Sequence, residues 1–158
     1  MNSIREIRRI LETCRNIAVV GLSPQWHRPS YFAAKYMQAH GYHIIPVNPG
    51  ATQILGQKSY PSVSEAAKEH RIDIVDCFRR TEDIGPLCEE AIAVGAKCLW
   101  QQIGVKNQDA YDRAKAAGLM AVMDRCVKIE HARLYGGLGW AGVNTRVISA
   151  RRPRQLPY

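Results

Sequence analysis

Long apolar runs, a signal sequence and metal-binding cysteine pairs are all missing from this 158-residue sequence. No apolar run approaches the roughly 18 residues that a membrane-spanning helix needs. Residues 1–6 lack the apolar core of a secretory signal, so we expect a cytoplasmic protein with no membrane partner. The five cysteines form no C-x-x-C pair and have no histidine at zinc-finger spacing, which favours reduced thiols and argues against a zinc site.

The glycine motifs of the common dinucleotide-binding and ATP-binding loops are missing as well. Gly21, which follows the first predicted strand, has no partner glycine before Gly41, so the G-x-G-x-x-G fingerprint is absent. A Walker loop would need G-K-S or G-K-T, and neither occurs. The second predicted strand ends in Asn48-Pro49, where an NAD enzyme carries an acid for the ribose hydroxyls. The missing glycines and the missing acid argue independently against NAD.

What the sequence does contain is typical of one globular α/β domain. Its length suits a single domain, and its 46% hydrophobic and 23% charged residues are close to globular averages. Helical and extended segments alternate with short connections, which predicts a Rossmann-like three-layer sandwich with a five-stranded, mainly parallel sheet. The strands are expected at residues 17–20, 43–47, 72–78, 97–101 and 119–123. Pro46 donates no ladder hydrogen bond, so the second strand is expected to lie near an edge or to be irregular there.

Positive charge gathers toward the C-terminus. The net charge is +8, and residues 131–158 hold five arginines and no acid. We expect residues 1–135 to form the folded domain and residues 136–158 to form a basic extension. Such a basic tail could bind nucleic acid or an acidic ligand. A solvated terminal tail is the favoured interpretation, because three of the arginines crowd around Pro153 in a segment that suits a groove-reading helix poorly.

The turn after the first predicted strand carries groups that suit a phosphate. Gly21 permits a tight turn and lets backbone N–H groups approach an anion closely. Ser23 adds a hydroxyl donor, and Arg28 adds a forked donor with a fixed charge. Ser30 is placed to cap the following helix, whose positive end would face the anion. An ordinary strand-to-helix loop is the alternative, and the four groups together favour a ligand site.

Further candidate groups follow the third and fourth predicted strands, at the edge of the sheet where open α/β proteins bind ligands. Arg79 and Arg80 concentrate positive charge there, which suits a polyphosphate or a 3′-phosphate. The alternative is a solvated pair that is matched to Glu82 and Asp83. Trp100, in the fourth strand, is interpreted as packing in the core or at the rim rather than as a stacking platform for a base.

Six segments, taken together and in order, resemble the small stand-alone CoA-binding proteins of the YccU-like type, which are related to the CoA-binding domain of succinyl-CoA synthetase. Each segment is a weak signal alone, and together they span about residues 3–135. The segments are 17–23 (IAVVGLS), 28–31 (RPSY), 41–42 with 45–49 (GY and IPVNP), 73–76 with 78–80 (DIVD and FRR), 96–104 (AKCLWQQIG) and 123–126 with 128–131 (MDRC and KIEH).

This resemblance implies that the chain binds coenzyme A at the carboxyl edge of a sheet of order 3-2-1-4-5. The first turn would hold the diphosphate, Val47 and Pro49 would border the nucleotide, and Phe78 and Arg79 would flank it. The turn at Gln102 would close the pocket. The predicted ligand site consists of Gly21, Leu22, Ser23, Arg28, Ser30, Val47, Asn48, Pro49, Phe78, Arg79, Gln102 and Ile103. The bulky Trp26 departs from the family pattern and leaves the path of the first loop open.

The synthetase relatives transfer acyl groups through a phosphohistidine held in further domains, for which this chain has no room. Its five histidines occur singly, so we interpret it as a non-catalytic binding module for CoA or an acyl-CoA. Two alternatives stay open, a nicotinamide-dinucleotide-binding redox protein and a nucleic-acid-associated protein that uses the arginine-rich tail. Cys126, after the fifth strand, is a hypothetical site for a mixed disulfide with the CoA thiol, and a buried small apolar residue is the favoured alternative.

Overall fold

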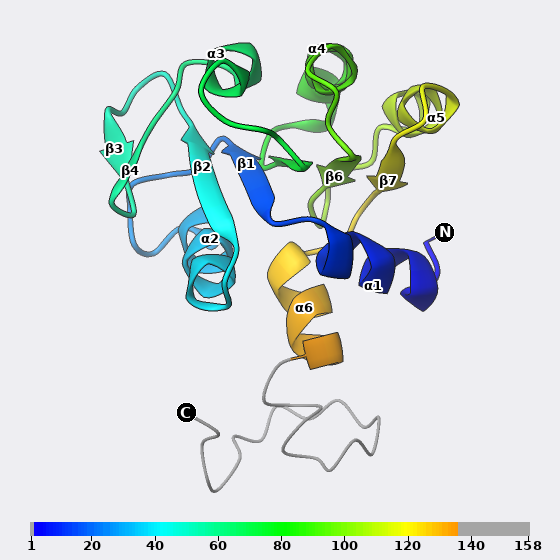
Figure 1. Cartoon of the computed structure of the whole chain (residues 1–158), viewed down its shortest axis with the longest axis horizontal. Coiled ribbons are helices and arrows are strands. Elements are labelled where there is room, and N and C mark those ends of the chain that lie inside the picture. The colour runs from blue at the N-terminus through cyan, green and yellow to red at the C-terminus, as the bar shows by residue number, and fades with distance from the viewer. Residues whose placement is uncertain (1, 136–158) are drawn as a thin grey trace, which may run out of the picture.

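Five parallel strands form the centre of the molecule (Figure 1). The structure, a computed structural model, describes residues 2–135, and the predicted basic extension at 136–158 lies outside the described residues. The strands are β1 (Asn16–Val20), β2 (His43–Val47), β5 (Ile74–Cys77), β6 (Cys98–Gln101) and β7 (Met120–Val122). Nearly all of their residues are buried, because helices cover both faces of the sheet. The predicted α/β class and the five predicted strands are confirmed.

The strands lie in the order β2-β1-β5-β6-β7. Beyond β2, an isolated parallel bridge joins Val47 to Tyr60, so the segment at Tyr60 takes the third position of the expected 3-2-1-4-5 pattern. The sheet matches that pattern, with one correction. The strand predicted as third in the chain, β5, pairs with β1 and not with β2. The reason is that the segment at Tyr60 already occupies the place beside β2.

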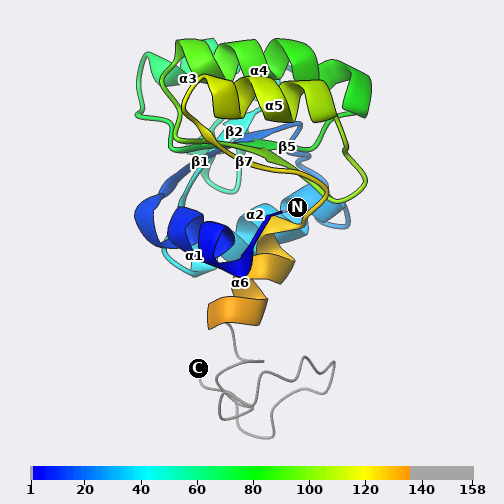
Figure 2. The same cartoon turned by 90° about the vertical axis from the view of Figure 1, so that its right-hand side faces the viewer.

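Helices form a layer on each face of the sheet, which confirms the three-layer sandwich (Figure 2). On one face lie α1 (Ile4–Thr13), α2 (Pro29–Ala39) and α6 (Val127–Tyr135). On the other face lie α3 (Val63–Ala67), α4 (Ile84–Ala93) and α5 (Gln108–Ala116). A separate cluster of buried apolar side chains fills the space on each side of the sheet. Among the described residues, no helix combines the length and apolar character needed to span a membrane.

Local signals explain some elements and miss others. The Ser3 hydroxyl accepts from the Glu6 N–H, and the Glu6 carboxylate accepts from the Ser3 N–H, so a capping box begins α1. Strand β2, which contains Pro46, is an edge of the five-stranded sheet, as expected. Helix α6 follows no clear apolar stripe, because its buried residues include the polar Glu130 and His131. The short hairpin of β3 (Gln53–Ile54) and β4 (Gln57–Lys58) is likewise absent from the sequence prediction.

His131 joins α6 to α2 through a cluster of rings. Its Nδ1 lies 3.0 Å from the Tyr36 hydroxyl, and the rings of His40, Tyr42 and Tyr135 lie within 5.6 Å of its own. Burial, together with His40 and a nearby arginine, lowers the pKa of His131 to about 4. Folding therefore favours the neutral imidazole.

Acid is expected to destabilise the protein through His131. The stability that its neutral form supplies is complete above the unfolded pKa of about 6.5 and is lost as the pH falls toward 4. The size of the loss is about 3 kcal/mol at most. Urea denaturation at several pH values should show the wild type losing stability relative to His131→Gln between pH 6.5 and 4.5. Parallel pH profiles of the two proteins would contradict this assignment.

The carboxyl ends of β1 and β5 mark the point where the connections change sides. Helix α2 follows β1 on one face of the sheet, whereas α4 follows β5 on the other (Figure 1). Because the two chains leave neighbouring strands in opposite directions, a crevice opens between them, and this is the position where open α/β sheets bind ligands.

Candidate functional site

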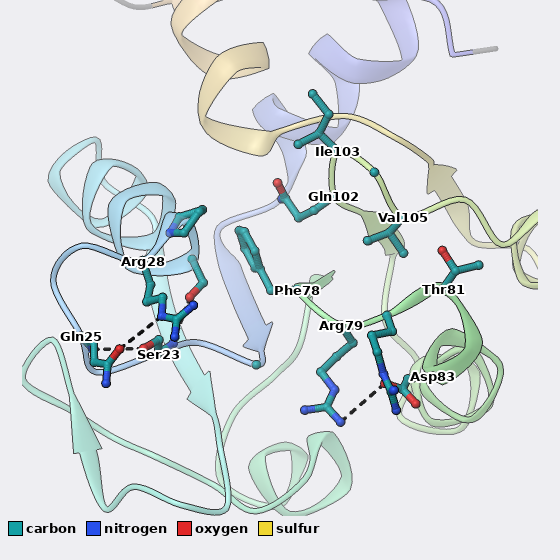
Figure 3. Close-up of a pocket in the computed structure, with 15 residues that line it drawn as sticks. Ser23, Gln25, Arg28, Phe78, Arg79, Thr81, Asp83, Gln102, Ile103 and Val105 are labelled. Atoms are coloured by element: carbon teal, nitrogen blue, oxygen red, sulfur yellow. Dashed lines mark hydrogen bonds and ion pairs between the residues drawn. The ribbon is translucent and has the colours of Figure 1, made fainter.

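Two adjoining cavities follow the carboxyl edge of the sheet and share the residues Gly21, Ser23, Arg79 and Asp83. The larger cavity has a volume of about 970 Å³ and is lined from the ends of β1, β5 and β6 and from the start of α2 (Figure 3). The smaller one, of about 490 Å³, is lined from the ends of β1 and β2 and from α3 and α4. The shared residues join the two cavities into one groove, which we call the edge groove.

Gly21 stands where β1 ends, between the two cavities. Its φ is +85°, a conformation that side chains with a Cβ rarely adopt. A Cβ there would collide with the Phe78 carbonyl oxygen and stand 3.1 Å from Cδ of Arg79. The Gly21 N–H donates to the Val47 carbonyl at 2.9 Å, so the backbone donors expected for an anion at this turn would have to come from other residues. The reason is that the ladder between β1 and β2 continues one residue past β1.

Two serine hydroxyls organise the turn that follows. The Ser30 hydroxyl accepts from the Ser23 N–H at 3.0 Å, and the Ser23 hydroxyl accepts from the Gln25 N–H at 3.1 Å. Each hydroxyl accepts in these bonds and so keeps its own O–H to donate to a phosphate oxygen. The prediction that Ser30 caps α2 is wrong, because Pro29 begins the helix and Arg28 occupies the N-cap position without a side-chain cap bond.

Three arginines and one carboxylate line the larger cavity. Nε of Arg28 donates to the Gln25 side chain at 3.2 Å, and no carboxylate of residues 2–135 pairs with this guanidinium (Figure 3). Arg79 lies 3.6 Å from Asp83, and Arg80 lies 3.3 Å from Asp83 and 3.5 Å from Glu82. Both arginines thus pair with the carboxylates that the alternative interpretation named, the role of Arg79 toward a ligand stays a prediction, and the cavity keeps an excess of positive charge.

The smaller cavity has an apolar wall, but three carboxylates, those of Glu82, Asp83 and Glu90, line it as well. Val47 and Pro49 from the end of β2 face Val63 and Leu87 from α3 and α4 across it. Asn48 at its border donates to the Leu22 carbonyl at 2.9 Å, which ties the turn after β2 to the turn after β1. The Leu22 side chain itself is fully buried in the core and lines neither cavity.

The turn after β6 forms the far wall of the larger cavity. Ile103 is 65% exposed there, whereas Gln102 is buried. Thr81 and Val105 complete this wall, and the sequence reasoning did not place them in the site. The Thr81 hydroxyl accepts from the Lys106 N–H at 3.2 Å, which joins the segment after β5 to the segment after β6. Both Thr81 and Val105 could have been predicted, because ligands of open α/β sheets bind to the residues that follow each strand.

A buried polar pair lies behind this wall. The Gln102 side-chain amide donates to a carboxylate oxygen of Asp76, and both side chains are almost fully buried. Burial raises the pKa of Asp76 to about 7, although the bond from Gln102 acts in the opposite direction. In this pair the Gln102 amide N–H group has a hydrogen-bond partner, whereas the Gln102 amide oxygen has none among the described residues.

Two further expectations concern Trp100 and Cys126. Trp100 is completely buried, and its Nε1 donates to the Arg125 carbonyl at 2.8 Å, so its assignment to the core is confirmed. Cys126 is partly exposed between β7 and α6 and lines neither cavity, whereas the other four free cysteines are buried. Its mixed disulfide with a thiol ligand stays a hypothesis.

Comparisons with known proteins place this fold in a family. Residues 15–132 match the family described as CoA binding domain. The uncharacterized protein YneT of Bacillus subtilis is 42% identical over 127 residues, which cover 80% of this chain and 93% of the relative. A hypothetical protein from Pyrococcus horikoshii superimposes with a TM-score of 0.81 at 39% identity, covering 85% of this chain and 94% of that one.

A more distant likeness concerns the fold alone. A dinucleotide-forming acetyl-coenzyme A synthetase of Ca. Korarchaeum cryptofilum matches with a TM-score of 0.60 at 18% identity, over 69% of this chain and 25% of that one. The family match, by contrast, spans β1 to α6 and so includes every turn that builds the edge groove. This chain belongs to the CoA binding domain family.

Proposed function

We propose that the chain binds coenzyme A in the edge groove and performs no catalysis on it. The observation that carries the proposal is the division of the groove into two unlike parts that meet at Gly21 and Ser23. The smaller part has an apolar wall at Val47, Val63 and Leu87 beside three carboxylates, and the larger part carries an excess of positive charge from three arginines. Coenzyme A has matching parts, a flat base, a charged phosphate region and a long flexible arm.

The groove suggests how these parts would lie. The adenine would enter the smaller cavity between Val47, Val63 and Leu87, where its faces would be shielded from water. The diphosphate would then lie at the Gly21 turn, near the free O–H groups of Ser23 and Ser30 and the positive end of α2. The arm would pass along the larger cavity toward the turn at Ile103.

A nicotinamide dinucleotide fits the same groove less well. The end of β2 offers Asn48 where a ribose-binding acid would stand, and the Asn48 side chain is already engaged by Leu22 and Gly50. Coenzyme A carries a 3′-phosphate that NAD lacks, and this additional anion suits the positive charge of Arg79, which lines both cavities. Both features favour coenzyme A.

Arg28 is the most direct test of the phosphate site. Because no carboxylate within residues 2–135 neutralises it, its charge is available to the ligand. Arg28→Ala is expected to weaken CoA binding about ten- to hundredfold, the value of a lost charge-assisted hydrogen bond. Calorimetric titration measures this change, with Arg5→Ala, an exposed arginine on α1, as the matched control. Equal CoA affinity in the two variants would remove Arg28 from the site.

The absence of catalysis is proposed from the groups that the larger cavity offers. Its lining holds one carboxylate, Asp83, which is engaged by Arg79 and Arg80 and is poorly placed to act as a base. Acetyl-CoA incubated with the protein is expected to release free thiol no faster than in buffer. Sustained thiol release that scales with protein concentration would show a hydrolase instead.

A further inference from the structure

Exposed apolar side chains occur on three segments that meet beside the larger cavity, and one of them, Ile103, lines it. The described residues expose six large apolar side chains, and three of them come from segments that meet there. These are Phe32 on α2, Ile103 in the turn after β6, and Ile129 on α6, with exposed fractions of 46%, 65% and 48%. We call these three residues the apolar rim.

Contacts hold the three segments of the rim together. The Gly104 N–H donates to the Asp124 carboxylate at 2.7 Å, which fixes the turn carrying Ile103 beside the residues that lead into α6. The Arg125 N–H donates to the Gln101 carbonyl at 3.3 Å and adds a second link. From α6, the Lys128 ammonium lies 5.9 Å from the centre of the Phe32 ring, which places α6 against the first turns of α2.

The rim joins the edge groove at Ile103. Ile103 belongs to both, since it lines the larger cavity, and Figure 3 shows it at the side of the cavity toward α6. Pro29 also lines the cavity, and Phe32 lies three residues further along α2, on the same side of the helix. A ligand that fills the larger cavity and extends past Ile103 would therefore meet apolar side chains.

Resting on the proposed function, we infer that the ligand is an acyl-CoA and that its apolar acyl chain lies on the apolar rim. If the diphosphate lies at the Gly21 turn and the base in the smaller cavity, the arm leads its sulfur toward Ile103. Free coenzyme A ends in a thiol that is too small to cover the rim, which therefore stays in water. An alkyl chain attached to that sulfur would cover the three side chains and gain from the burial of both surfaces.

Titration of the full chain with coenzyme A and with its acetyl, butyryl, hexanoyl and octanoyl thioesters tests the inference. Affinity is expected to rise about two- to fourfold for each added methylene until the chain outgrows the rim. Phe32→Ser and Ile129→Ser are expected to flatten this series and to leave the affinity for free coenzyme A unchanged. Ile4→Ser is the matched control, because Ile4 is 56% exposed on α1, outside the rim.

Several results would overturn the inference. Equal affinities for coenzyme A and all four thioesters would show that the acyl chain makes no contact with the protein, while the proposed function would stand. If affinity rises with acyl-chain length as steeply in Phe32→Ser and Ile129→Ser as in the wild type, the acyl chain must bind elsewhere. Self-association that Ile129→Ser abolishes, without any dependence on chain length, would assign the rim to a second copy of the protein. Absence of binding for every ligand would reject the proposed function itself.

Discussion

Replacing Gly21 with alanine is expected to destabilise the fold by about 2–5 kcal/mol and to abolish measurable CoA binding. The left-handed φ of +85° costs a residue with a Cβ about 1–2 kcal/mol. The added methyl would also strike the Phe78 carbonyl, so the ends of β1 and β5 must move apart, at a cost of about 1–3 kcal/mol. That movement would displace Ser23 and Arg79, which line both cavities.

Gly118→Ala separates the cost of the left-handed backbone conformation from the cost of the steric clash. Gly118 has a φ of +92°, but a Cβ there would meet nothing within 4 Å. We therefore expect it to lose only about 1–2 kcal/mol and to bind coenzyme A as the wild type does. Urea denaturation and calorimetric titration of both variants measure the difference. If Gly21→Ala matched Gly118→Ala in stability and in affinity, the close approach at Gly21 would have no role in the site.

Replacing Asp76 with asparagine is expected to stabilise the protein at pH 8 by about 2–4 kcal/mol. Burial raises the pKa of Asp76 to about 7, so the folded protein favours the protonated acid. The favourable contribution is complete below the unfolded pKa of about 3.9 and is lost as the pH rises toward 7. Asparagine carries no charge at any pH, and its amide can donate to the unpartnered oxygen of Gln102.

Asp73→Asn is the matched control, because Asp73 is equally buried and lies close to Asp76 in the chain. Burial raises the pKa of Asp73, but hydrogen bonds from the backbone N–H groups of Asn16 and Arg15, together with the charges of Arg71 and Lys97, outweigh it and lower the pKa overall. Asp73→Asn should therefore destabilise at pH 8. Denaturation between pH 4 and 8 should show the advantage of Asp76→Asn growing with pH. A pH-independent difference from the wild type would refute a charge-based explanation.

Much of the fold could be predicted from the sequence, because the information lies in local patterns. Unbroken apolar runs identify β1 and β5, and the Ser3–Glu6 spacing identifies the start of α1. Helix α6 escaped prediction because Glu130 and His131 face the interior, where apolar residues are usually expected. The neighbour of β5 could not be derived from the sequence either, since it depends on a bridge at Tyr60 that lies outside any regular strand.

The members of the candidate site could also be predicted from the sequence, whereas the hydrogen bonds among them could not. Of the twelve predicted ligand residues, all but Leu22 line one of the two cavities, because the rule about strand ends is topological and needs no contacts. Hydrogen bonds within the turn could not be foreseen. The Gly21 N–H donates to the Val47 carbonyl. The Ser30 hydroxyl accepts from the Ser23 N–H in the loop instead of capping a helix. The arginines at 79 and 80 are partly neutralised by Asp83, which left Arg28 as the more available charge.

Calorimetric titration of the full chain with coenzyme A tests the central claim most directly. We predict saturable binding of one coenzyme A per chain, which is lost in Gly21→Ala, weakened in Arg28→Ala and unchanged in Arg5→Ala. The same protein should give no saturable heat with NAD or NADP at matched concentrations. The absence of any heat or rise in melting temperature with coenzyme A, together with saturable binding of NAD, would contradict this account.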